Sequence, residues 1–566
     1  MKPYGGILLA LLLAGCGGEG GVGVARLELP VYPPGDVVVL SFDALRADEI
    51  AGYGAGRDAT PAFARLAAES ILFEDVLSAA GSTPTAFAAL WSGRWPHRTF
   101  IGWRFEAEPT LAELFRNAGY RTALFADNVQ LSPVRKFDRG FDVAVVERND
   151  ADESTAARDH RLLEGALEWL AEKSERPSLL WIHLLDPHAP YSRHARLEDR
   201  YRAPPVERFR ESSGGRFEIE SPEELVWLRE LYRGEVAIAD EHLGRLLDWL
   251  DERGRAATTT LVVTADHGEQ FGEHGGVQHG TLYAEVTTIP LFLRLPDRRG
   301  AGSRSTLPFS QVDLLPTLAA LHGVRAPQHL DGIDWLAGGP RDRIRLAEAM
   351  TAEDHLAIAA SDGQYDLISR CEDSFETGAL FDRRRDPRQT RDLAAEEPER
   401  YLALARRLRG VFALAPCAEL ARANQGAVDT SATSPAPAPA PSAADAERSG
   451  LSPEELAGLQ ALGYLGGSRP PAAGAVRIWF EPDPLPLCEP GGFGIVKVRW
   501  SGAGGPIAIE VGAEGKVFAT GGPAGEAVTG PWANSRTVFT VRDLRSERML
   551  VARAPGVVPC SAAAAP

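Results

Sequence analysis

Acidic and imidazole side chains follow three of the apolar segments that the sequence predicts as β-strands. Asp43 follows the first such segment, Asp186 and His188 follow another, and Asp266 with His267 follow a third. The carboxyl ends of parallel strands meet at one edge of a sheet, so we expect these side chains to gather there. Carboxylate and imidazole groups are suitable ligands for a divalent ion such as Zn²⁺ or Mn²⁺. For Asp43 alone, a helix cap is the alternative.

Thr83 is the candidate nucleophile. It precedes Pro84 in the segment 81–91, where we expect Thr83 to be the N-cap of a helix and Pro84 its first residue. The start of a helix offers unpaired backbone N–H groups and partial positive charge, which would stabilise a phosphoryl or sulfuryl group held over Thr83. A metal touching the hydroxyl would lower its pKa. An ordinary capped helix is the alternative.

Alternating strands and helices must position these residues. Apolar runs rich in β-branched residues alternate with amphipathic stretches before residue 424, which predicts an α/β fold with a mostly parallel sheet covered by helices on both faces. The expected strands are 37–41, 122–125, 179–183, 260–264 and 290–294, and two of the expected helices are 61–69, capped by Thr60, and 235–250.

The C-terminal part has a different composition. Residues 424–450 are rich in Pro, Ala and Ser and predict an extended linker. A short helix is expected within 451–467, where Ser452 and Pro453 are suited to its start. Alternating polar and apolar residues within 473–566 then predict a small β-sandwich, whose strands include 494–500 and 538–541. We expect that domain to serve packing or binding.

The first sixteen residues read as a targeting segment, with Lys2 followed by a short apolar run. The stretch Leu13-Ala14-Gly15-Cys16 resembles a bacterial lipobox, which implies lipidation of Cys16 and a membrane-anchored protein in the bacterial cell envelope, facing the periplasm or the exterior. A plain secretory signal is the alternative. The other four cysteines predict two local disulfides in an oxidising compartment, pairing Cys371 with Cys417 and Cys488 with Cys560.

Composition excludes some classes of function. Apolar residues make up 44% of the 566 residues and charged residues 24%, which indicates a folded chain of several domains. The net charge of −18 would repel a nucleic-acid backbone, so no nucleic-acid partner is expected. An anionic small substrate remains compatible with this charge, because a metal ion dominates the field inside a cleft.

Taken in order, several segments resemble the sulfatase-like branch of the alkaline phosphatase superfamily, over a predicted catalytic domain of residues 34–415. The resemblance implies that Asp43, Asp266 and His267 hold one divalent ion, which would be Zn²⁺ or Mn²⁺, with Ca²⁺ or Mg²⁺ as alternatives. It also implies that Thr83 is the nucleophile and that His188 and His279 bind the substrate anion, with second-metal positions as the alternative for both histidines. The matching motifs include Val39-Leu-Ser-Phe-Asp43, Leu90-Trp-Ser-Gly93-Arg-Trp-Pro96, Trp181-Ile-His-Leu-Leu-Asp186-Pro-His188, Val263-Thr-Ala-Asp266-His267-Gly268, His279-Gly-Thr-Leu-Tyr283 and Leu380-Phe-Asp382.

The sequence also departs from the sulfatase pattern. Sulfatases carry Cys or Ser where this chain has Thr83, with Pro and Arg where it has Thr85 and Phe87, and a second Asp where it has Ala44. We therefore expect no formylglycine, and the chain looks like the Thr-dependent phosphotransferases and phosphodiesterases of the superfamily. The resulting prediction is an extracytoplasmic, metal-dependent hydrolase or transferase of phosphate esters. The alternatives are a sulfate ester hydrolase and a catalytically silent binding lipoprotein.

Overall fold

An eight-stranded sheet forms the centre of the computed structural model, which describes residues 31–32, 35–412 apart from short gaps, and a set of strands between 477 and 559. The strand order is β15-β2-β14-β11-β1-β8-β6-β7. All neighbours pair in parallel except the two pairs made by β14. The strands are β1 (Asp36–Phe42), β2 (Ile71–Phe73), β6 (Arg121–Ala126), β7 (Val143–Val146), β8 (Ser178–Leu184), β11 (Thr259–Ala265), β14 (Leu291–Arg294) and β15 (Arg304–Ser305).

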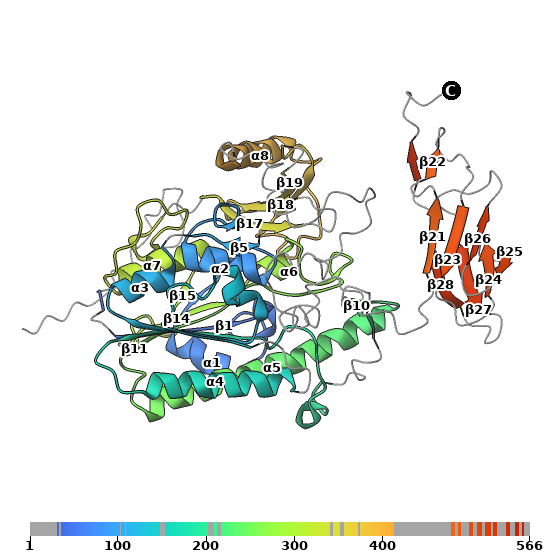
Figure 1. The fold of residues 1–566 in the computed structure, drawn as a ribbon. Helices are drawn as coiled ribbons and strands as arrows, with labels where there is room; N and C mark the ends of the chain where they lie inside the picture. Colours follow the sequence, from blue (N-terminus) through green and yellow to red (C-terminus); the bar gives the residue numbers. More distant parts are fainter. Residues whose placement is uncertain are drawn as a thin grey trace, which may run out of the picture.

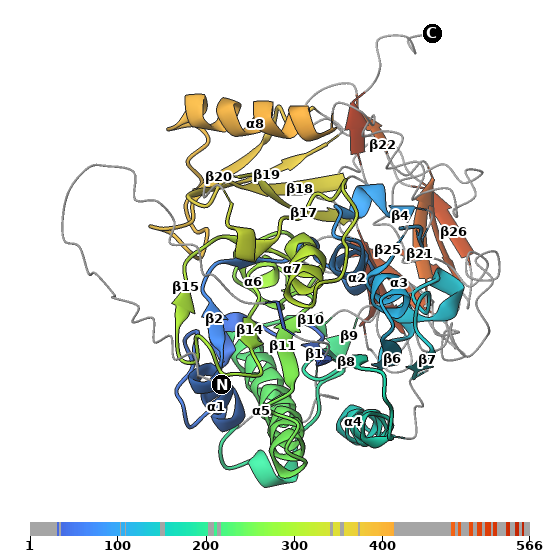
Figure 2. The ribbon, with the colours of Figure 1, turned by 90° about the vertical axis from the view of Figure 1, so that its left-hand side faces the viewer.

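The sequence-based fold prediction is confirmed. All five expected strands are present, and the sheet is mixed but mostly parallel. Strands β1, β8 and β11 are buried along their length, apart from the first residue of β1, because the sheet is covered on both faces. Helices α1 (Pro61–Glu69), α4 (Thr155–Ala171) and α5 (Pro222–Glu252) lie on one face, and α2 (Thr83–Ser92), α3 (Leu111–Asn117) and α7 (Leu314–Leu321) lie on the other (Figures 1 and 2).

A smaller antiparallel sheet follows the central one. Its strands are β17 (Arg345–Met350), β18 (Leu356–Ser361), β19 (Tyr365–Arg370) and β20 (Gly378–Asp382), and α8 (Pro398–Phe412) covers it (Figure 2). A backbone bridge between Ala80 and Glu348 joins β17 to the loop before α2. The buried Arg345 side chain pairs with Asp75 at 2.9 Å. These contacts tie the smaller sheet to the segment that carries Thr83.

Short elements complete this part of the chain. The four-residue helix α6 (Ala284–Thr287) follows the loop that contains His279. Two-stranded pairs are formed by β3 (Val76–Leu77) with β16 (Phe309–Ser310), β4 (Phe100–Ile101) with β5 (Arg104–Phe105), β9 (Arg210–Glu211) with β10 (Phe217–Glu218), and β12 (Gln270–Phe271) with β13 (Val277–Gln278).

The C-terminal part is a separate all-β region, as the alternating pattern predicts. The two strands anticipated there correspond to β23 and β27. The sheets have the orders β21-β23-β26, β25-β24-β27-β28 and β22-β29. Their strands are β21 (Arg477–Glu481), β22 (Leu485–Leu487), β23 (Lys497–Ser501), β24 (Ile507–Val511), β25 (Lys516–Gly521), β26 (Gly525–Val528), β27 (Phe539–Asp543), β28 (Met549–Arg553) and β29 (Val557–Pro559).

Several predictions fall outside the described residues. They concern the targeting segment with Cys16, the linker 424–450 and the helix within 451–467. Cys371 is disulfide-bonded, and the other four cysteines lie outside the described part of the chain, so both pairings stay predictions. No helix in the described residues is long and apolar enough to cross a membrane.

Candidate active site

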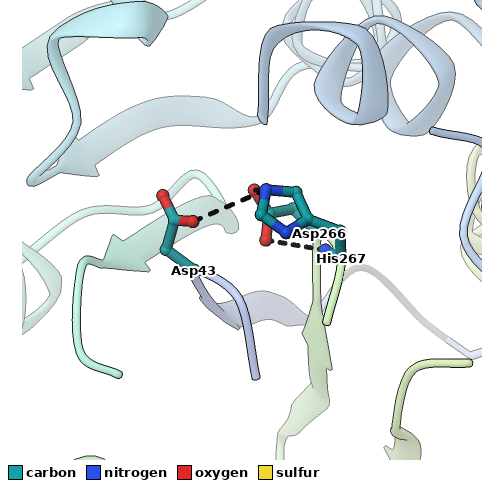
Figure 3. A group of neighbouring side chains, drawn as sticks. All are labelled: Asp43, Asp266 and His267. Carbon is teal, nitrogen blue, oxygen red and sulfur yellow. Dashed lines mark hydrogen bonds and ion pairs between the residues drawn. The ribbon is translucent and has the colours of Figure 1, made fainter. Parts of the chain in front are cut away.

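Two neighbouring central strands bring three predicted metal ligands together. Strands β1 and β11 pair in parallel with Phe42 opposite Ala265, so the residues that follow them emerge side by side. Asp43 leaves β1, and Asp266 with His267 leave β11 (Figure 3). All three side chains are buried, and one ligand atom from each lies within 4.8 Å of the other two. The structure thus brings together three of the side chains expected at this edge, whereas Asp186, expected with them, lies in a different group with Asp159 and His242. That the three hold a metal ion stays a prediction.

The hydrogen bonding of the three side chains fits a divalent cation. Asp43 Oδ1 and Asp266 Oδ2 are buried and accept no hydrogen bond. His267 Nε2 lies 3.7 Å from the first of these oxygens and 3.5 Å from the second. His267 Nδ1 lies 2.9 Å from the Gly268 carbonyl oxygen, and donation there leaves the Nε2 lone pair free to face the carboxylates. Two oxygens and one nitrogen thus converge on one point, as the ligands of a cation would.

The electrostatics of this group also call for positive charge. Burial raises the pKa of Asp43, but His188, His183 and His267 outweigh burial, and the pKa is lowered. Burial raises the pKa of Asp266, and the nearby Asp43 carboxylate adds to this rise. The two carboxylates therefore disfavour being ionised together unless a cation lies between them.

Thr83 lies next to these carboxylates. Helix α2 begins at Thr83 with Ser82 as N-cap, one residue earlier than the sequence suggested. The Thr83 hydroxyl donates to Asp43 Oδ2 at 3.3 Å and lies 3.5 Å from His267 Nε2. The hydroxyl therefore faces the buried acidic group, and the predicted N-cap assignment is corrected by one residue.

Asn128 was missed by the sequence reasoning. Its side-chain amide donates to Asp43 Oδ2 at 2.6 Å and lies 3.5 Å from Thr83 Oγ1. Asn128 follows the end of β6, which is another strand of the same parallel set. The rule that found Asp43 would have found Asn128 had it been applied to the strand at 122–125.

His183 adds a second contact to Asp43. It lies within β8, and its Nε2 is 3.3 Å from Asp43 Oδ2. The Ser41 hydroxyl and His183 Nδ1 are 3.0 Å apart, which fixes the orientation of the ring. Asp43 is thus contacted by polar side chains from α2, β8 and the segment after β6.

The two histidines predicted to bind substrate lie beside the metal group. The His279 ring is 4.3 Å from the His267 ring and 4.9 Å from the His188 ring, measured between centroids. Glu269 Oε1 lies 3.1 Å from His279 Nδ1, and the Tyr191 hydroxyl donates to Glu269 Oε2 at 2.8 Å. Burial, together with the charge on His267, lowers the pKa of His279 to about 4. The roles of His188 and His279 stay predictions.

The departures from the sulfatase pattern have clear structural consequences. Phe87 is fully buried and packs edge-on against His183, with ring centroids 4.7 Å apart. Ala44 has a left-handed backbone with φ of 57°, and its N–H donates to Asp266 Oδ1 at 3.1 Å. At position 44 a backbone amide therefore replaces the second Asp carboxylate of sulfatases. At position 87 an aromatic ring replaces their Arg.

Comparisons with known proteins identify a family and a fold that this chain resembles. A family model described as Sulfatase matches residues 35–324, about half of the chain. An N-acetylglucosamine-6-O-sulfatase of Bacteroides thetaiotaomicron is 28% identical over 176 residues, covering 29% of this chain and 31% of that protein. The chain spans at most 38% of the length of the first three relatives it matches.

Solved structures share the fold. A phosphonate monoester hydrolase of Agrobacterium radiobacter superposes with a TM-score of 0.56 at 20% identity, covering 67% of this chain and 96% of that one. A protein solved in complex with its substrate D-glucosamine-2-N,6-O-disulfate also gives a TM-score of 0.56, at 18% identity, covering 69% of this chain and 99% of that one. At these identities the likeness establishes the fold alone.

Proposed function

The chain belongs to the sulfatase family, and from that premise we propose that it is a metal-dependent hydrolase or transferase of phosphate esters with Thr83 as its nucleophile. The carrying observation is the Thr83 hydroxyl, which lies 3.3 Å from Asp43 Oδ2 beside a buried acid and imidazole group. A threonine that only began helix α2 would not need its hydroxyl beside the Asp43 carboxylate. We further propose that the protein works outside the cytoplasm, anchored through a lipidated Cys16.

The residues that would hold the metal ion are Asp43, Asp266 and His267, whose buried unpaired oxygens and free imidazole nitrogen fit a divalent cation. Such an ion supplies positive charge that stabilises the phosphoryl oxygens and favours the ionised Thr83 oxygen. The family resemblance favours Zn²⁺ or Mn²⁺, and these oxygen and nitrogen donors suit both ions.

The side chains of the site support an in-line displacement. The Thr83 oxygen attacks phosphorus while its hydroxyl proton moves toward Asp43 Oδ2, the acceptor of its hydrogen bond. The bond from phosphorus to the leaving oxygen breaks, and a ring N–H of His188 supplies the proton that this oxygen needs. His279 serves to bind the substrate anion. Water or an acceptor hydroxyl then displaces Thr83 from the phosphothreonine. Asn128 holds Asp43 in place throughout, through its 2.6 Å hydrogen bond.

Sulfate ester hydrolysis is the second candidate. It is supported by the relative named as a sulfatase and by the solved structure that holds a sulfated glucosamine. The phosphate proposal is supported by Thr83, because the modification that yields formylglycine begins from Cys or Ser. It is also supported by the phosphonate monoester hydrolase among the structural neighbours.

Paired threonine variants test the proposal. Thr85 lies on the same helix, but its hydroxyl bonds to Ser82 instead of Asp43, so Thr85→Ala is the matched control for Thr83→Ala. Release of p-nitrophenol from p-nitrophenyl phosphate, its diester and p-nitrophenyl sulfate is measured with and without added metal. We expect metal-dependent phosphate ester turnover in wild type and Thr85→Ala, and loss of turnover in Thr83→Ala.

Other outcomes discriminate among the alternatives. Full activity in Thr83→Ala would refute the nucleophile assignment. Turnover confined to the sulfate ester would favour the second candidate. Absence of turnover of every ester by a protein without bound metal would favour the silent binding protein.

A further inference from the structure

A second buried group of two aspartates and one histidine includes residues of α4 and α5, which cover the face of the sheet opposite to α2 (Figure 1). Asp159 comes from α4, Asp186 follows β8, and His242 comes from α5. One ligand atom from each lies within 4.8 Å of the other two. Asp159 and Asp186 are fully buried, and His242 is 6% exposed. The three residues come from different parts of the chain, and they meet because α4 packs against both α5 and β8.

Several ligand atoms of this group make no hydrogen bond, which suits the binding of a cation. Both carboxylate oxygens of Asp186 are buried and accept no hydrogen bond. His242 Nδ1 is also buried and without a partner. The ring of His242 bonds the Ala156 backbone, and donation of its other N–H there leaves the Nδ1 lone pair available. A buried carboxylate without any donor is costly unless a cation or a proton compensates it.

The surrounding charges leave the group with an excess of negative charge. Arg158 Nε lies 3.1 Å from Asp127 Oδ2, so the positive charge of this guanidinium is paired with Asp127, a carboxylate outside the group. The Asp159 oxygens accept the backbone N–H groups of Leu185 and Asp186, at 3.0 and 2.8 Å, which orients that carboxylate. Burial, then the neighbouring carboxylates, raises the pKa of Asp159 and that of Asp186 well above the usual value.

We infer that Asp159, Asp186 and His242 form a second divalent-cation site, which locks α4 and α5 onto the end of β8. Two carboxylates and one imidazole match the donors that Zn²⁺ or Mn²⁺ accepts. The backbone hydrogen bonds to Asp159 and the contact of His242 with Ala156 are the outer contacts that orient metal ligands. The site carries no nucleophile of its own and is structural. It does not depend on the proposed function of Thr83.

Counting bound zinc tests the inference. The full chain without a histidine tag is loaded with Zn²⁺, dialysed exhaustively against metal-free buffer and analysed by mass spectrometry for metal per chain. We expect two ions in wild type. One ion should remain in the double variant Asp43→Asn, Asp266→Asn, which removes the first group, and one in Asp186→Asn, which removes the second.

Two further variants guard against misfolding and against nonspecific loss. His242→Gln alters the same group from a different helix and should also hold one ion if Asp186→Asn does not fold. His160→Gln is the matched control, because the exposed His160 ring lies 6.3 Å from the His242 ring without belonging to the group. It should retain two ions. One ion in wild type with none in the double variant would overturn the inference and show that protons hold the second group. Two ions in both Asp186→Asn and His242→Gln would also overturn it.

Discussion

This protein has two buried groups of the same composition, each of two aspartates and one histidine: Thr83 of α2 contacts the first, and α4 and α5, on the opposite face of the sheet (Figure 1), contribute to the second. In the first, Asp43, Asp266 and His267 follow two paired central strands and are bordered by the Thr83 hydroxyl. In the second, Asp186 follows a strand, but Asp159 and His242 come from helices that cover the sheet. The comparison teaches that ligand type alone does not fix a role, because the proposed nucleophile Thr83 contacts the first group through Asp43.

The strongest way to separate the groups is through catalysis. Thr83→Ala should lower kcat on the order of 10⁴-fold, as loss of a nucleophile does, with little change in melting temperature. His242→Gln should instead lower the melting temperature while turnover per folded molecule stays within a few-fold, because its group holds no reacting atom. Steady-state kinetics and thermal melts of both variants check this. A His242→Gln enzyme as inactive as Thr83→Ala would erase the distinction.

Chelation should reveal the stabilising role of the second group. A cation present at about 100 times its dissociation constant adds about 2.7 kcal/mol to the free energy of unfolding. Removal of metal with a chelator should therefore destabilise wild type, and the destabilisation should be smaller in Asp186→Asn, which has one stabilising ion less to lose. Urea unfolding with and without the chelator measures the difference. Equal sensitivity in both proteins would count against a structural ion.

A variant of Asn128 tests whether the orientation of Asp43 matters for activity. Its amide holds Asp43 Oδ2 at 2.6 Å, so Asn128→Ala should lower kcat/KM about 10- to 100-fold, the usual effect of removing a residue that orients a metal ligand. Gln130 follows Asn128 in the same short turn and is buried, and its backbone N–H, which a side-chain substitution keeps, donates to Asn128 Oδ1. Gln130→Ala is thus the matched control and should retain most activity. Comparable losses in both variants would point to damage to the turn rather than to Asp43.

The smallest effect concerns His322, whose ring contacts Thr260 near the start of β11, whereas Asp266 follows the end of that strand. Burial lowers the pKa of His322 to about 4, and its ring lies 3.1 Å from the Thr260 hydroxyl. Because the folded pKa lies below the unfolded one, the stabilisation is fully present above about pH 6.5 and is lost as pH falls toward 4. His322→Gln should reduce this loss by on the order of 1 kcal/mol. Urea titrations from pH 4 to 8 provide the measurement, and an unchanged pH profile would contradict it.

The sequence by itself determined the fold class and the first group. The strands that precede Asp43 and Asp266 are short runs rich in buried β-branched residues, a local pattern that indicates buried strands. Residues that directly follow neighbouring parallel strands emerge at the same end of the sheet, which predicted that Asp43 would lie near Asp266 and His267. Asp186 follows β8 but contributes to the other group, so this rule does not settle every neighbour. The start of α2 near Thr83 was predicted from local helix signals, with an error of one residue in the N-cap.

Only the tertiary structure decided the rest. Asp159 and His242 lie inside amphipathic helices, where a single polar residue looks like any other until the packing of α4 against α5 fixes which faces meet. Likewise, the sequence does not show that Phe87 packs against His183, or that the Asn128 amide reaches Asp43, because both contacts join segments far apart in the chain. Local periodicity fixes elements and their ends, whereas contacts between helix faces depend on how distant elements pack together.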